Sequence, residues 1–120
     1  MKIFVNIKIR GVIKLNNKIK IMISQPMRNK SNEQIKEERA KLVKRLEKDN
    51  FEVIDTIISE DAPKCYNEGI YYLAKSIEFM SKADIVYFMK GWEKARGCRI
   101  ENQICQDYKK QTMYNIYEEE

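Results

Sequence analysis

The amino-acid sequence predicts an α/β protein with a mostly parallel sheet, because segments of strand character alternate with segments of helical character. Short apolar or β-branched runs occur at residues 19–23, 51–58, 84–89 and 112–117. Apolar residues at helical spacing lie between these runs, over residues 31–49, 70–81 and 98–108. Such alternation is typical of parallel strands joined by helical crossovers, and ligands of these proteins bind beyond the carboxyl ends of the strands.

The overall composition indicates a single soluble domain. The chain has 120 residues, enough to bury a core without disulfides or metals, and 43% of them are hydrophobic. No apolar run has membrane-spanning length and no signal-peptide pattern is present, so we expect a cytoplasmic protein. The formal net charge is +5, but the basic residues are mixed with glutamates, as in residues 36–39. We therefore expect neither a nucleic-acid polymer nor a membrane as a partner.

The absence of histidine narrows the possible chemistry. The sequence has no His, and its three cysteines form no Cys-x-x-Cys pair. Ser-His-Asp and Cys-His catalysis are excluded, as are zinc sites that use imidazole. We expect no metal and no cofactor. Any acid, base or nucleophile must come from Asp, Glu, Cys, Tyr, Lys or Ser.

The first 18 residues differ from the rest of the chain. Apolar residues alternate as in a strand up to Ile9, and Arg10-Gly11 is a turn signal. Residues 1–18 are therefore either an added hairpin or a poorly ordered N-terminal extension. The domain proper spans residues 19–120.

Two residues mark the starts of elements. Ser31 opens the first long helix, with Gln34 three residues later as a capping-box partner. Asp84 stands at the start of its strand, away from the expected ligand-binding edge, so we interpret it as a strand-entry cap or a turn residue.

Three loops are expected at the carboxyl ends of the strands, at residues 24–30, 59–67 and 90–97. The first loop leads into a helix, a geometry that suits a phosphate, although an ordinary polar loop explains it equally well. Its polar and basic residues are Ser24, Gln25, Arg28, Asn29 and Lys30. In the third loop, Trp92 either stacks on a ligand base or covers the core or a subunit interface.

Glu101 stands out in the last helix. At about 100° per residue, the buried arc of this helix is defined by Ile100, Ile104, Cys105 and Tyr108. Glu101 falls within that arc and in the expected first turn, where the helix dipole favours a negative charge. It either complements the helix start, or pairs with a buried arginine, or points into a pocket as a nucleophile or general base.

Three stretches of the chain resemble a bacterial and phage family grouped with the nucleoside 2-deoxyribosyltransferases. These are Ile-Ser-Gln-Pro-Met at residues 23–27, Asp-Ile-Val-Tyr-Phe at 84–88, and Gly-Trp-Glu-x-x-Arg-Gly-x-x-x-Glu at 91–101. The similarity covers residues 19–117, and the third stretch is its most specific part.

The resemblance implies a flavodoxin-like, doubly wound fold with a mostly parallel four- to five-stranded sheet. It also implies a nucleoside or nucleotide as ligand, and a homo-oligomer in which a neighbouring subunit helps to complete the site. Glu101 matches the transferase nucleophile, which attacks the anomeric carbon in the manner of a retaining glycosidase. The implied function is that of a nucleoside or nucleotide N-glycosidase, or a deoxyribosyltransferase-like protein.

This sequence departs from the transferase pattern in its supporting residues. Where the transferases carry two further aspartates, this chain has Ser76 and Ala95, and the aromatic residue of their first strand is replaced by Met22. The departures favour an alternative in which the same pocket captures a nucleotide without turning it over. A third hypothesis is that the chain is a structural oligomer in which Glu101 belongs to a buried ion pair.

The candidate catalytic residues are Glu101, the nucleophile, and Glu93, a proton donor for the leaving base. Asp55 and Tyr66 are other possible donors. The candidate ligand-binding residues come from the three loops and the start of the last helix: Ser24, Gln25, Pro26, Met27, Arg28, Asp55, Gly91, Trp92, Arg96 and Gly97.

Overall fold

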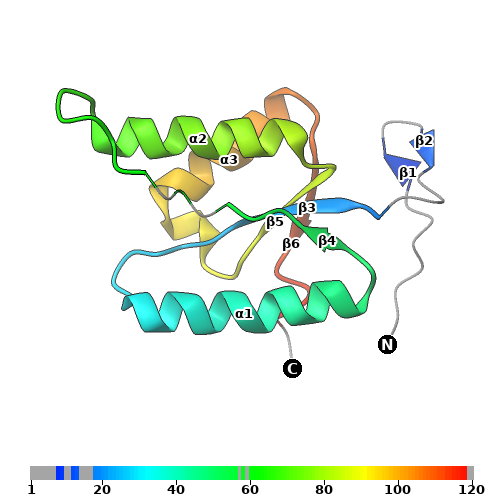
Figure 1. The fold of residues 1–120 in the computed structure, drawn as a ribbon. Helices are drawn as coiled ribbons and strands as arrows, with labels where there is room; N and C mark the ends of the chain where they lie inside the picture. Colours follow the sequence, from blue (N-terminus) through cyan, green and yellow to red (C-terminus); the bar gives the residue numbers. More distant parts are fainter. Residues whose placement is uncertain (1–7, 10–11, 14–17, 57, 59, 119–120) are drawn as a thin grey trace.

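The computed structural model describes residues 8–9, 12–13, 18–56, 58 and 60–118, and its centre is a four-stranded parallel sheet (Figure 1). The strands are β3 (Lys20–Ser24), β4 (Glu52–Val53), β5 (Ile85–Phe88) and β6 (Gln111–Tyr114). Their order in the sheet is β4-β3-β5-β6, and every neighbouring pair is parallel. The chain therefore winds outward in both directions from β3 and β5, as in a flavodoxin-like fold, and the predicted fold class is confirmed.

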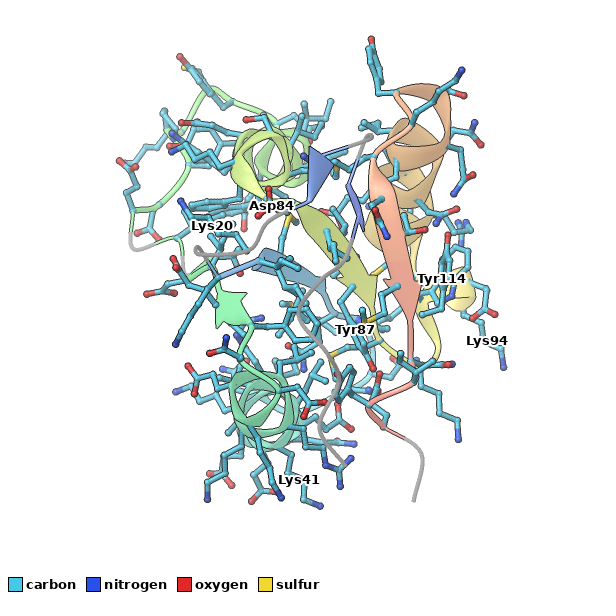
Figure 2. The ribbon with its side chains drawn as sticks, turned by 90° about the vertical axis from the view of Figure 1, so that its right-hand side faces the viewer. Lys20, Lys41, Asp84, Tyr87, Lys94 and Tyr114 are labelled. Carbon is cyan, nitrogen blue, oxygen red and sulfur yellow. The ribbon has the colours of Figure 1, made fainter. Side chains whose placement is uncertain are left out.

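Helices cover both faces of this sheet. Figure 1 shows α1 (Asn32–Lys48) on one face and both α2 (Glu68–Lys82) and α3 (Arg96–Asp107) on the other. A short 3-10 helix, η1 (Trp92–Lys94), lies between β5 and α3. Viewed from the side, the sheet runs between α1 below and the α2–α3 layer above (Figure 2).

Each face of the sheet carries its own apolar cluster. Ile21, Ile23 and Tyr87 pack with residues of α1 such as Leu42 and Leu46. The alternate side chains of the same strands, among them Met22, Val86 and Phe88, pack with Met80, Cys98 and Cys105 of α2 and α3. Burial on both faces explains why the two central strands, β3 and β5, are nearly continuous apolar runs without polar alternation.

Several boundaries differ from the sequence prediction. Of the predicted strand at residues 51–58, the described part forms β4, because Glu52 and Val53 pair with β3 and the chain leaves the sheet edge after the Ile54 amide bonds the Ile21 carbonyl. The last strand ends at Tyr114, not 117, and Asn115 follows with a left-handed φ of 31°. Helix α3 begins two residues earlier than predicted, so Glu101 lies in its second turn. The prediction of Glu101 in the first turn, next to the dipole, is wrong.

The two predicted end signals are confirmed. The Ser31 hydroxyl caps α1 by accepting a hydrogen bond from the Gln34 amide at 3.1 Å. The Asp84 carboxylate accepts a hydrogen bond from the Lys20 amide at 2.9 Å, which joins the starts of β5 and β3. Asp84 therefore holds the amino edge of the sheet, opposite the expected site.

Ahead of the sheet, β1 (Lys8–Ile9) pairs antiparallel with β2 (Val12–Ile13). The predicted turn at Arg10-Gly11 and the predicted alternation before Lys8 lie outside the described residues. Within the described part of the chain, none of the helices is both long and apolar enough to span a membrane.

Candidate functional site

Ser24 and Glu101 meet at the carboxyl edge of the two central strands. Ser24 is the last residue of β3 and lies beside Phe88, the last residue of β5. Glu101 reaches this point from α3, and both side chains are buried, with exposed fractions of 2% and 7%. The Ser24 hydroxyl donates a hydrogen bond to Glu101 Oε1 at 2.6 Å. The predicted burial of Glu101 is confirmed.

The environment of Glu101 is apolar and hydroxyl-rich. Burial raises the pKa of the Glu101 carboxyl, while hydrogen bonds from Ser24 and Ser76 act in the opposite direction. Among residues 18–56 and 60–118, no lysine or arginine forms an ion pair with this carboxylate. The interpretation of Glu101 as half of a buried ion pair therefore has no support in the described structure. A carboxylate that is bound by hydroxyl groups and by no cation can still act as a nucleophile or a general base.

Two buried thiols flank the carboxylate on α3. Burial and the nearby Glu101 charge raise the pKa of Cys98, against a hydrogen bond with Ser24 that lowers it. Burial and the same charge raise the pKa of Cys105 to about 11, and its sulfur lies 3.8 Å from Met80 Sδ. Since the thiolate is the reactive form, neither cysteine is suited to nucleophilic attack.

The loop after β3 begins with buried residues and turns at exposed residues. Gln25 and Pro26 are buried, whereas Met27 and Arg28 are exposed. The Gln25 side-chain amide donates a hydrogen bond to the Ile35 carbonyl at 2.9 Å, which ties the loop to α1, and no described residue bonds its Oε1 atom. Of the loop residues that we predicted to bind a ligand, Met27 and Arg28 can contact a ligand that arrives from solvent without a change in the loop conformation.

The loop after β5 lies against the loop after β3. Gly91 has a left-handed φ of 91°, and a Cβ atom there would lie 3.9 Å from Pro26 Cγ. The next residue, Trp92, packs on Phe88 and Tyr114, with ring centroids 5.4 Å apart in both pairs. These contacts favour the interpretation of Trp92 as a residue that covers the core.

The predicted proton donors lie on the surface. Glu93 is an exposed residue of η1, and its backbone carbonyl accepts a hydrogen bond from Arg99 at 3.2 Å. Asp55 is exposed beside Arg39, whose pKa is lowered by burial and raised by this carboxylate. Tyr66 is also exposed. Within the described residues, no hydrogen bond joins Glu93 to Glu101.

Arg96 and Gly97 form the exposed first turn of α3. A Cβ atom built at Gly97 would meet no atom within 4 Å. The space next to the helix start is therefore open, which a ligand at this end of α3 would require.

The helical-wheel prediction missed two features of the site. Ile100 and Tyr108 were assigned to the buried arc, but they are 39% and 76% exposed, because α3 packs through the face of Cys98, Glu101 and Cys105. A helical wheel shows which residues share a face of the helix, but it does not show how the helix is rotated about its axis relative to the sheet. Ser76 was missed as a partner of Glu101, although it is a small polar residue inside the apolar stripe of its helix.

The fold and this site define a doubly wound α/β protein with a buried carboxylate at the switch point of its sheet. The model of a domain of unknown function, DUF4406, matches residues 1–114, and the chain belongs to this family. Neither the curated proteins nor the solved structures include a match to this chain.

Proposed function

We propose that this protein cleaves or transfers the N-glycosidic bond of a nucleoside or nucleotide, with Glu101 as the nucleophile. The resemblance of residues 91–101 to the nucleoside 2-deoxyribosyltransferases motivates the reaction class. The observation that carries the proposal is the buried carboxylate of Glu101, which pairs with no lysine or arginine of residues 18–56 and 60–118 and is oriented by Ser24 at the carboxyl edge of the sheet. Buried carboxylates without a compensating cation are costly, and functional sites are where proteins retain them.

The proposed reaction has two steps. In the first, a Glu101 oxygen attacks the anomeric carbon, the C–N bond breaks, and the base leaves with a proton supplied by Glu93. In the second, water or another free base attacks the glycosyl ester and releases Glu101. The hydrogen bond from Ser24 stabilises the ionised carboxylate before attack and orients one of its two oxygens.

A second candidate function is capture of a nucleotide without turnover. The position at which transferases carry a supporting aspartate holds Ser76, whose hydroxyl acts to lower the pKa of Glu101 but adds no second carboxylate. Ala95 likewise adds no acid or base. A site of this kind can bind the sugar through Glu101 yet lack the means to protonate the leaving base.

The proposal includes a homo-oligomer, in line with the same resemblance. The outer surface of α2 and α3 supports it, since large apolar side chains are exposed there, namely Ile70, Ile77, Ile100 and Tyr108. Of these, Ile77 and Tyr108 line one cavity between α2 and α3, and exposed apolar patches often mark an interface. Sedimentation of the purified protein over a concentration series tests this part directly.

The experiment for the activity uses a panel of nucleosides and nucleoside monophosphates, with and without a second free base. Base release is followed by chromatography for the wild type and for Glu101→Gln, which keeps the side-chain shape. We expect release or exchange in the wild type and its loss in the variant. Glu78→Gln, an exposed glutamate on α2, is the matched control. No turnover from the wild type, together with ligand-dependent thermal stabilisation, would replace the enzyme by the capture function.

A further inference from the structure

A cavity of about 260 Å³ opens on the α1 face of the sheet, the face opposite α3 and Glu101. It is lined by Lys30, Glu38, Lys41, Leu42, Arg45, Met89, Lys90 and Glu118. Lys30 precedes α1, Lys90 follows β5 and Glu118 lies beyond β6, so the cavity begins at the carboxyl edge and extends along α1. No residue of the candidate catalytic site lines it.

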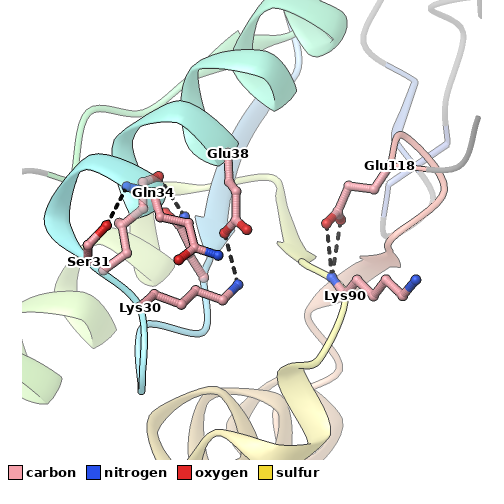
Figure 3. Close-up of polar contacts among 8 residues, drawn as sticks. Lys30, Ser31, Gln34, Glu38, Lys90 and Glu118 are labelled. Carbon is pink, nitrogen blue, oxygen red and sulfur yellow. Dashed lines mark hydrogen bonds and ion pairs between the residues drawn. The ribbon is translucent and has the colours of Figure 1, made fainter.

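Basic groups outnumber acidic groups in this cavity. Its lining has four basic residues and two glutamates, and both carboxylates already have partners. Glu38 accepts the Lys30 ammonium at 2.8 Å, and Glu118 accepts the Lys90 backbone amide at 3.1 and 3.2 Å. Figure 3 shows these two pairs on opposite sides of the gap between α1 and the loop after β5.

Positive charge remains after these pairings. Among the hydrogen bonds and ion pairs of the described residues, none uses the ammonium group of Lys41 or of Lys90. Arg45 is already engaged, by its hydrogen bond to the Tyr117 carbonyl at 2.7 Å and by a further interaction, so the remaining positive charge comes from the two lysines. Lys41 and Lys90 are exposed, but both line the same cavity, and two like charges at one site attract an anion more strongly than a single exposed lysine does.

The apolar lining residues are Leu42 and Met89. They are only 1% and 4% exposed, so they form the floor of the cavity. The volume lies below the usual range of about 300 to 1,000 Å³ for drug-sized ligands. Compact anions with a small carbon skeleton fit these properties, and lysines bind phosphate well as point charges. We propose that this cavity is a second ligand site, which binds a small phosphate monoester.

The cavity is linked to the catalytic edge by a short hydrogen-bonded path. Its lining residue Met89 donates its backbone amide to the Ser24 carbonyl at 3.1 Å, and the Ser24 hydroxyl binds Glu101. The chemical shift of the Met89 amide should therefore change when a ligand occupies the cavity.

The test is a titration of the ¹⁵N-labelled protein with inorganic phosphate and with glycerol phosphate, at constant ionic strength. We expect saturable amide shifts at Leu42, Met89 and Lys90. Lys41→Glu is expected to weaken binding by about tenfold or more, because it replaces a charged donor by a repelling charge. Lys44→Glu makes the same charge change on α1 outside the cavity and is expected to retain binding.

Several results would overturn the proposal. They are shifts confined to residues 24–28, equal weakening by the two α1 variants, or the absence of saturation at the lining residues. Circular dichroism of both variants shows whether they are folded. Titration of Glu101→Gln separates this inference from the proposed reaction, because phosphate should still bind the cavity when Glu101 is neutral.

Discussion

The Ser24 hydroxyl donates to the Glu101 carboxylate at 2.6 Å across 77 residues of sequence, and joins the end of β3 to the middle of α3. Both groups are buried, so neither can exchange this bond for water without opening the loop. A hydrogen bond to a buried charge contributes more to stability than one between neutral groups, about 1.5–3 kcal/mol. Ser24 therefore affects both the fold and the ionisation of Glu101.

We expect Ser24→Ala to lower the free energy of unfolding by about 2 kcal/mol. It should also raise the pKa of Glu101 further, since a bond that favours the ionised form is lost. The loss of stability should therefore be larger at alkaline than at acid pH. Urea denaturation at several pH values measures both effects.

Ser81→Ala is the control for this variant, because its hydroxyl bonds the Glu78 carbonyl at 2.6 Å on the exposed surface of α2. We expect it to change stability by less than about 0.5 kcal/mol, independently of pH. Equal effects of the two substitutions would show that Ser24 has no special relation to Glu101.

Glu101→Gln is expected to stabilise the protein at neutral pH. Burial raises the folded-state pKa of Glu101 above the ordinary value of a glutamate, so the folded state binds the proton more tightly than the unfolded state. Its contribution to stability is complete below the unfolded-state pKa and is lost as pH rises through the folded-state pKa. Glutamine does not titrate, so the gain should grow with pH, to about 3 °C in Tm.

The measurement is thermal unfolding of wild type and variant from acid to mildly alkaline pH. Glu78→Gln, whose side chain is 63% exposed, should show no gain that depends on pH. A Glu101→Gln gain that is constant or decreases with pH would contradict the raised pKa.

Gly97→Ala and Gly69→Ala form a matched pair, since each glycine is the second residue of its helix. A Cβ at Gly97 meets open space, and one at Gly69 lies at an ordinary 3.6 Å from Asn67. Each alanine should stabilise its helix by about 0.5–1 kcal/mol, because glycine loses more backbone entropy on folding.

The two variants should differ in ligand binding. If a nucleotide approaches the start of α3, the added methyl group at 97 occupies its space, so Gly97→Ala should weaken nucleotide-dependent thermal stabilisation while Gly69→Ala preserves it. Preserved stabilisation in both would place the ligand away from Gly97.

The sequence predicted the alternating elements because strands buried on both faces form continuous apolar runs, a pattern independent of distant contacts. The length of β4 was overestimated because, in contrast, the extent of strand pairing does depend on distant contacts. Residues 51–58 are rich in β-branched side chains, but among the described residues the pairing with β3 covers Glu52 and Val53 and ends with the Ile54 amide on the Ile21 carbonyl, because pairing depends on where the chain leaves the sheet.

The candidate site was predicted in outline only. The burial of Glu101 followed from its position on the wheel, because a charge inside an apolar arc is unusual. The contact of Glu101 with Ser24 depends on the rotation of α3 about its axis, which the wheel leaves open, and Ile100 was placed on the wrong side for the same reason. Only packing against β5 and α2 determines that rotation.

Tyr117 connects the end of the described chain to both the sheet and α1. Its hydroxyl donates to Asp49 Oδ2 at 2.6 Å, and its amide donates to the Tyr87 hydroxyl at 2.9 Å. Asp49 is 6% exposed, so loss of the tyrosine hydroxyl leaves a buried carboxylate oxygen without this donor. Tyr117→Phe should therefore lower the free energy of unfolding by about 1–3 kcal/mol.

Tyr108→Phe is the matched control, because Tyr108 is 76% exposed and water can satisfy its hydroxyl. It should unfold within about 0.5 kcal/mol of the wild type in urea. Similar destabilisation by both variants would mean that the Tyr117–Asp49 bond does not hold the C-terminal segment. A loss confined to Tyr117→Phe would show that the residues after β6 belong to the cooperative fold, and with them Glu118 in the cavity wall.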